Sequence, residues 1–349
     1  MARPDRLQLL RTLEEQRGSR VVALLTGTRG PNYATIIAAD APPLLYWHLE
    51  RIGQVPQIDL LLYSQGGHTL SGFRIPGLIR EYCKRFCVLI PYRAHSSATL
   101  VALGADEIVM TPLAELSPVD PSTNGPFNPP VPVPVAPGEL PPTLPVSVED
   151  VVGYMNLASE EAKISGSEAM RGVFERLATD VRPLALGQVF RARSQIRMLI
   201  RKLLKQHQKP PHRWTVRRVV RALSQDLLSH DYLIVRDEAR KLGLPVTNAS
   251  PEHERLIFGL YRDYEEAMHL PDAFNLETVL PGQGTTQVTF DRAYIESAAG
   301  AHIYRTVKNF RRALQPVMMP GPAGVHPAQQ LQTEERVISD GWLLTGAQA

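Results

Sequence analysis

The sequence has few cysteines and no long apolar segment. Only two of its 349 residues are cysteine, Cys83 and Cys87, too few for a disulfide framework or for the full ligand set of a zinc site. No uncharged apolar run approaches the roughly 18 residues that cross a bilayer, and the charged first residues lack the apolar core of a secretory signal. We therefore expect a cytoplasmic protein with buried free thiols, no membrane association, no metal and no cofactor.

The chain also lacks a strong excess of either charge. Its 38 Lys and Arg side chains nearly balance 35 Asp and Glu, and a net charge of +3 argues against binding of a polyanion by the whole molecule. Residues 191–221 depart from this balance, with eleven basic and no acidic side chains. On a helical projection, Ile196 and Leu199 lie opposite Arg193 and Arg197. We interpret this segment as an amphipathic helix with a solvated basic face; an acidic partner or nucleic acid is the alternative.

The first third of the chain has the pattern of an α/β protein. Three compact apolar runs have the length of strands, at 20–27, 58–64 and 85–92. Helical patterns lie between them, at 43–52 and 70–84. Continuous apolar strands that alternate with helices are typical of a parallel sheet covered on both faces, because the crossover helices hide each strand from water.

The composition changes after this region and suggests several parts. We expect an N-terminal helix over 1–18, a main α/β domain over 19–270 and a small β-containing extension over 271–315. Residues 126–145 carry nine prolines in twenty positions, a composition that disfavours helices and central strands and predicts an extended surface insertion. The last segment, 316–349, is rich in Pro, Gly and Gln, and we expect it to be loosely ordered.

Two short motifs stand where a parallel sheet places its functional site. Gly66 and Gly67 follow one predicted strand, and Ser96 and Ser97 follow the next and precede a predicted helix. Both loops emerge at the carboxyl ends of parallel strands, where ligands bind in such folds. Each motif alone has an ordinary explanation, a tight turn or a helix cap. Together, backbone N–H donors beside a helix-starting serine have the composition of an oxyanion hole next to a nucleophile.

Four segments resemble the successive motifs of a known family. They are "YSQGGHTLSG", "AHSSATLVALGADEIVM", "LSPVDPS" and "SHDYLIVRDEARKLGLPV". They resemble the serine dehydrogenase proteinase family, related to signal peptide peptidase A within the Clp protease and crotonase superfamily, over about residues 20 to 250. The resemblance implies that the main domain is a Clp protease/crotonase-like spiral of β-β-α units, with a serine peptidase mechanism, a peptide or protein substrate and homo-oligomeric assembly.

The resemblance also assigns site residues. In these relatives a serine of the alanine-serine motif is the nucleophile, and Ser96 is the matching residue here. Ser97 would supply a backbone N–H to the oxyanion hole together with Gly67, next to Gly66. The sequence departs from the family at Ala98, where a glycine is common.

The general base stays open between two candidates. The Clp subunit's histidine has no counterpart, because its position falls in "PVDPS". Asp231 matches the Clp subunit's acid, with His230 beside it, although adjacent residues on a strand point to opposite faces. Signal peptide peptidases use lysine, and Lys163 is the sole lysine between Ser96 and Lys202. A buried lysine with a lowered pKa can deprotonate a serine.

Three functions compete at this point. The first is a serine peptidase that acts through an acyl-enzyme on Ser96. The second is a crotonase-type acyl-CoA enzyme, which uses paired backbone N–H groups but needs no nucleophile at the helix start. The third is an inactive scaffold that binds a partner through the proline-rich insertion or the basic segment.

Overall fold

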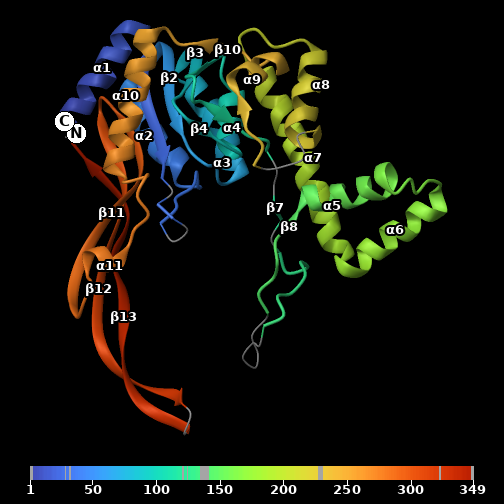
Figure 1. Cartoon of the computed structure of the whole chain (residues 1–349). Coiled ribbons are helices and arrows are strands. Elements are labelled where there is room, and N and C mark those ends of the chain that lie inside the picture. Colours follow the sequence, from blue (N-terminus) through green and yellow to red (C-terminus); the bar gives the residue numbers. More distant parts are fainter. Residues whose placement is uncertain are drawn as a thin grey trace.

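An eight-stranded mixed sheet forms the centre of the protein (Figure 1). The computed structural model describes residues 3–346 except 28, 31–32, 120–121, 124, 134–140, 227–230 and 322–323. In spatial order the strands are β10 (Val246–Asn248), β5 (Glu107–Met110), β3 (Cys83–Ile90), β2 (Val55–Tyr63), β1 (Arg20–Thr26), β11 (Gly284–Ser297), β12 (Gly300–Gly321) and β13 (Gly324–Thr345). Neighbours from β10 to β1 pair in parallel, whereas β11, β12 and β13 add antiparallel.

Helices cover both faces of the parallel part, as the continuous apolar strands predict. One face carries α2 (Ala41–Ile52), α3 (Thr69–Arg80), α4 (Ser97–Leu103), α7 (Pro183–Lys205), α8 (Arg213–Arg221) and α9 (Arg236–Leu242). The other face carries α1 (Arg3–Arg17) and α10 (Pro251–Ala267). Along β1, Val22 packs in the first core and Val21 in the second, because successive strand residues point to opposite faces.

A small second sheet lies where the main strands end. It consists of β4 (Arg93–Ala94), β6 (Glu115–Leu116) and β9 (Ile234–Val235), and Ser64 forms an isolated bridge with Ala94. Thus β3, β4 and α4 form one β-β-α unit, and β5 leads into β6 in the same way. The predicted α/β fold built from β-β-α units is confirmed.

Three projections leave this core (Figure 1). The first is the proline-rich segment between β7 (Ser122–Thr123) and β8 (Val146–Ser147), with a bridge between Pro130 and Thr143. The second is the helical arm, which we define as α5 (Val148–Asn156), the π-helical turn η1 (Leu157–Glu161) and α6 (Ser167–Asp180). The third is the β12–β13 hairpin, which extends from the core on the same side as the proline-rich segment.

The expectation of a loosely ordered segment at 316–349 is wrong. Strand β12 continues to Gly321, and β13 returns along it from Gly324 to Thr345. Pro316 is compatible with this ladder because β11 pairs with β12 only as far as Arg312, so one edge of β12 needs no donor at Pro316. Near the core, the indole N–H of Trp342 donates to Asp40 at 2.7 Å and attaches the hairpin to the start of α2.

The basic segment is an amphipathic helix, although its cationic face is not fully solvated. The α7 side chains Ile196 and Leu199 are buried, as expected. Arg193 and Arg197, however, are half-buried. Burial, followed by the charges of Arg193 and Arg201, lowers the pKa of Arg197.

Cys83 and Cys87 are buried free thiols on β3. Burial raises the pKa of Cys83 to about 11, which keeps this thiol protonated and unreactive near neutral pH.

Within the described residues, no helix combines the length and the apolar composition that crossing a bilayer requires.

Candidate active site

The glycine loop after β2 touches the serine loop after β4. A Cβ atom on Gly66 would lie 2.8 Å from Ser96 Cβ and 2.9 Å from the His95 carbonyl oxygen. Gly66 also has a φ of 108°, a conformation that residues with a side chain rarely adopt. A Cβ on Gly67 would collide with the backbone of Ile37. Gly66 is therefore required for the close approach of the two loops, and Gly67 for the close approach of the Ile37 backbone.

Ser96 has the geometry of a strained turn rather than of a helix cap. It precedes the first residue of α4 with φ 52° and ψ −116°, and its hydroxyl makes no capping hydrogen bond. A positive φ costs a residue with a side chain on the order of 1–3 kcal/mol. The Ser96 side chain is half-buried, whereas Ser97 is buried. The capping explanation for these serines therefore fails.

A network of hydroxyl groups holds this turn in place. The Ser96 N–H donates to Ser117 Oγ at 2.8 Å, and Ser117 Oγ donates onward to the Pro118 carbonyl at 3.0 Å. Thr99 Oγ1 donates to the carbonyl of Ala94 at 2.8 Å, and it accepts from the Ser117 N–H at 3.2 Å. Ser117 and Thr99 are both buried, so the strain at Ser96 is supported by bonds that water cannot easily replace.

Two backbone N–H groups beside Ser96 have no acceptor among the described residues: those of Gly67 and Ser97. The Gly66 N–H, in contrast, donates to Ser64 Oγ at 2.9 Å. The Ser97 nitrogen would lie 3.2 Å from a Cβ on Gly66, so it borders the glycine loop directly. The two open donors therefore lie at the junction of the two loops.

An ionic group adjoins the serine loop. His95 Nε2 lies 3.2 Å from Glu115 Oε1, and Arg93 Nε donates to the same oxygen at 3.0 Å. Strand β6 brings Glu115 to this place because it pairs with β4 in parallel. The roles of Glu115 and of the buried Thr99 and Ser117 hydroxyls were not predicted, although Ser117 lies in the motif "LSPVDPS".

The predicted base candidates do not join this cluster within the described residues. Lys163 is exposed and lies between η1 and α6, in the helical arm that stands clear of α4 (Figure 1). Asp231 is exposed and precedes β9, whose partner β6 pairs with the strand leading to Ser96. His230 lies outside the described residues.

Comparison with known proteins adds the family to this geometry. Residues 2–130 match the family model described as ClpP-like SDH-type serine proteinase. The resemblance stated from the motifs is thereby confirmed.

The curated relatives are archaeal proteins described as uncharacterized. MJ1495 of Methanocaldococcus jannaschii is 36% identical over 125 residues, covering 33% of this chain and 41% of that protein. The chain thus spans less than half the length of that relative. MJ0137 of the same organism is 26% identical over 266 residues, covering 74% of this chain and 78% of that protein.

Two solved structures resemble the chain at low identity. ClpP1 from Listeria monocytogenes has 13% identity and a TM-score of 0.34, covering 70% of this chain and 99% of that one. The structure titled 1510-N membrane-bound stomatin-specific protease has 14% identity and a TM-score of 0.24, covering 38% and 63%.

Proposed function

We propose that the protein is a serine endopeptidase that cleaves peptide bonds through an acyl-enzyme on Ser96. The observation that carries the proposal is the Ser96 turn. Its backbone is strained, its hydroxyl caps no helix, and its conformation is fixed by buried hydrogen bonds to Ser117 and around Thr99. Strain that the surroundings maintain at an accessible nucleophile is typical of catalytic serines. The match of residues 2–130 to a serine proteinase family supports the same chemistry.

The two open N–H groups supply the oxyanion hole of the proposed reaction. In the proposed mechanism, Ser96 Oγ attacks the carbonyl carbon of the substrate, and the N–H groups of Gly67 and Ser97 bind the oxyanion that forms. Fixed donors of this kind contribute about 3–4 kcal/mol each to acyl transfer. The base accepts the proton of Ser96 Oγ during this attack and gives it to the leaving amine as the C–N bond breaks. Water, deprotonated by the same base, then attacks the ester and releases the acyl group, and the proton returns to Ser96.

The identity of the base is the least supported element. We favour Lys163 over the alternative pair of His230 and Asp231, because signal peptide peptidases use lysine. Lys163 stands in the projecting helical arm. It therefore reaches Ser96 only if the arm moves or if a second copy of the chain supplies it. We accordingly propose that the active form is a homo-oligomer.

Labelling with a fluorophosphonate tests the proposal. The purified protein should react covalently, and mass mapping should place the label on Ser96. Ser96→Ala should abolish labelling, whereas Ser97→Ala, the matched control, should retain it because only the Ser97 backbone participates. Ser96→Ala should also abolish cleavage of an unfolded protein substrate. Absence of labelling in the wild-type oligomer would favour an inactive scaffold instead.

A further inference from the structure

The helical arm has an apolar face that its own chain covers only in part. Helix α6 has no buried residue, yet Met170, Val173, Phe174 and Leu177 recur at the spacing of one helix face. Phe174 is 51% exposed, and Leu157 in η1 is 58% exposed. A helix of this length is marginal in water without tertiary packing. The face therefore needs a partner.

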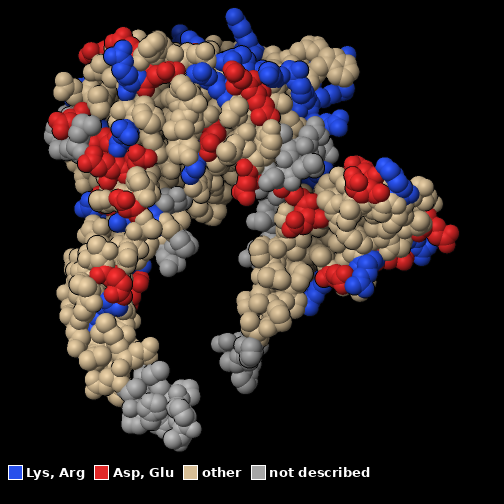
Figure 2. Space-filling model, in the orientation of Figure 1, with Lys and Arg blue, Asp and Glu red and all other residues tan. Residues whose placement is uncertain are grey.

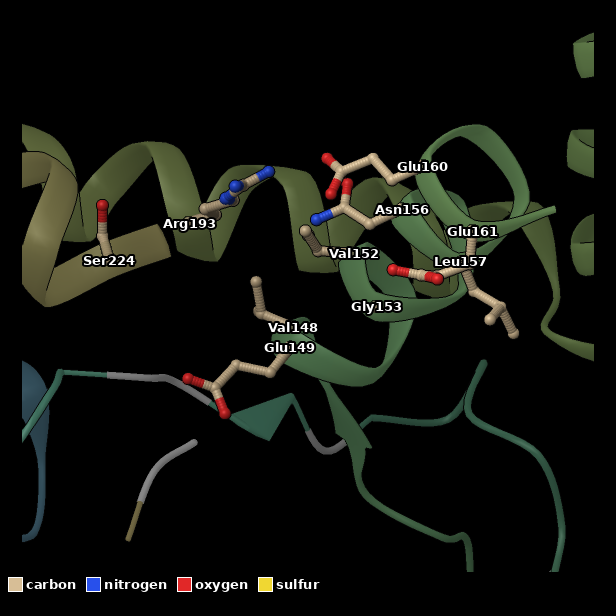
Figure 3. A pocket seen from close by; sticks show the side chains of 10 residues that line it. All are labelled: Val148, Glu149, Val152, Gly153, Asn156, Leu157, Glu160, Glu161, Arg193 and Ser224. Carbon is tan, nitrogen blue, oxygen red and sulfur yellow. The ribbon is translucent and has the colours of Figure 1, made fainter. Parts of the chain in front are cut away.

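A groove lies between this arm and α7 (Figure 3). Its volume is about 360 Å³, and a neighbouring hollow of about 880 Å³ shares Val152 and Arg193 with it. Glutamates from α5 and η1 line the groove: Glu149, Glu160 and Glu161. The side chain of Arg193 lies between Ser224 and Asn156 in this view. The groove thus combines apolar walls with carboxylates.

The arm carries a negative charge, and a basic surface lies elsewhere on the same chain. Residues 148–180 hold seven acidic and three basic side chains, a net charge of −4. Residues 205–221 hold six basic side chains and no acidic one. In Figure 2 many Lys and Arg side chains lie over the α8 end of the molecule, whereas the arm below shows acidic and basic side chains together.

The basic surface presents an exposed aromatic side chain. Trp214 on α8 is 59% exposed, and the guanidinium groups of Arg213 and Arg217 lie 5.3 Å and 4.9 Å from its ring centroid. Tryptophan and arginine are the residues that most often dominate protein interfaces. Val219 and Val220 are buried and anchor α8, so Trp214 is held at the surface of its own chain.

We propose that the acid-lined groove of one copy binds the Trp214 face of α8 in a second copy. The indole would pack on the apolar walls near Arg193, and Arg213 and Arg217 would pair with the glutamates. This arrangement covers the open face of the arm and neutralises opposite charges in one contact. The inference concerns assembly and does not depend on the peptidase chemistry.

Two variants remove the two sides of the contact separately. The arm variant combines Glu149→Lys, Glu160→Lys and Glu161→Lys. The α8 variant combines Trp214→Ala, Arg213→Glu and Arg217→Glu. A matched control reverses two exposed cations on α10, Arg255→Glu and Arg262→Glu, far from both surfaces in the fold.

Sedimentation velocity at micromolar concentration is the measurement. The wild type and the control should be oligomers, and each variant alone should sediment at monomer mass with unchanged circular dichroism. An equimolar mixture of the two variants should regain a mass above that of the monomer, because each contributes the intact half that the other lacks. Raising salt from about 0.1 M to about 1 M should weaken wild-type association roughly tenfold, since the charges are solvent-accessible.

Three results would overturn the proposal: a wild type that stays monomeric, variants that keep the wild-type mass, or a mixture that remains monomeric. Because the readout is mass, an inactive Ser96 would leave the test intact. The recovery in the mixture also separates loss of the contact from misfolding, since a misfolded variant would not be rescued by its counterpart.

Discussion

Ser96 and Lys163 share an unusual positive φ, 52° and 55°. Their surroundings differ. At Lys163 the chain ends a helical turn, and the Ala162 and Ile164 N–H groups donate to the carbonyls of Leu157 and Ala158, as at many helix ends. At Ser96 the turn is enclosed by the buried hydroxyls of Ser117 and Thr99. A positive φ is thus an ordinary chain reversal at one site and part of a proposed nucleophile at the other.

The largest expected effect comes from the base. Lys163→Arg keeps the charge and approximate length of the side chain, but a guanidinium accepts no proton near neutral pH. If Lys163 deprotonates Ser96, fluorophosphonate labelling should slow by about 10²- to 10⁴-fold, the usual contribution of a general base. Thermal unfolding should stay unchanged, because Lys163 is exposed. A fully active Lys163→Arg together with an inactive His230→Gln would assign the base to histidine.

The second effect concerns the glycine loop. Gly66→Ala should destabilise the protein by about 3 kcal/mol, because backbone strain adds to crowding against Ser96. Gly166→Ala is the matched control in the arm: φ there is 93°, but nothing lies within 4 Å of the added Cβ. Its cost should be strain alone, about 1 kcal/mol. Urea denaturation measures both, and equal costs would contradict the packing argument.

A smaller effect is expected from the support of the Ser96 turn. Ser117→Ala leaves the Ser96 N–H without its acceptor, and the unfolding free energy should fall by about 1–3 kcal/mol. Labelling of Ser96 should slow as well, because the turn loses its fixed conformation. Ser147→Ala removes the cap of α5 in the arm and should cost about 1 kcal/mol without affecting the labelling rate. Unchanged labelling in Ser117→Ala would show that the Ser96 turn keeps its conformation without the hydrogen bond to Ser117.

The smallest effect is a pH dependence of stability. Burial lowers the pKa of His207, although the hydrogen bond from Nε2 to the Leu103 carbonyl opposes the shift. The unfolded chain therefore binds the proton more readily, so this contribution is present above the ordinary histidine pKa near 6.5 and is lost as the pH falls below it. Urea denaturation between about pH 8 and pH 5 measures the unfolding free energy as a function of pH. This free energy should change less with pH in His207→Gln than in the wild type.

Much of the site was predictable because it follows from local sequence and sheet topology. Gly66 and Ser96 follow neighbouring parallel strands, so their loops had to meet at one edge. Ser117 was not predictable in its role, because only the small sheet with β6 brings it under Ser96. The error at 316–349 arose because composition says nothing about pairing: Pro and Gly are tolerated where β12 and β13 have an open edge.

Gly72 in α3 has a consequence for how such a site can be controlled. A side chain at Gly72 would strike the Ser97 carbonyl and lie 3.0 Å from Ser97 Cβ, so α3 and α4 meet backbone to backbone. The glycine loop leads into α3 and the serine loop into α4. The proposed nucleophile and the two proposed oxyanion donors are thus attached to helices in close backbone contact, which leaves little room for one helix to slide past the other. If Ser96 is the nucleophile, we expect control to act through access to its hydroxyl or through delivery of the base.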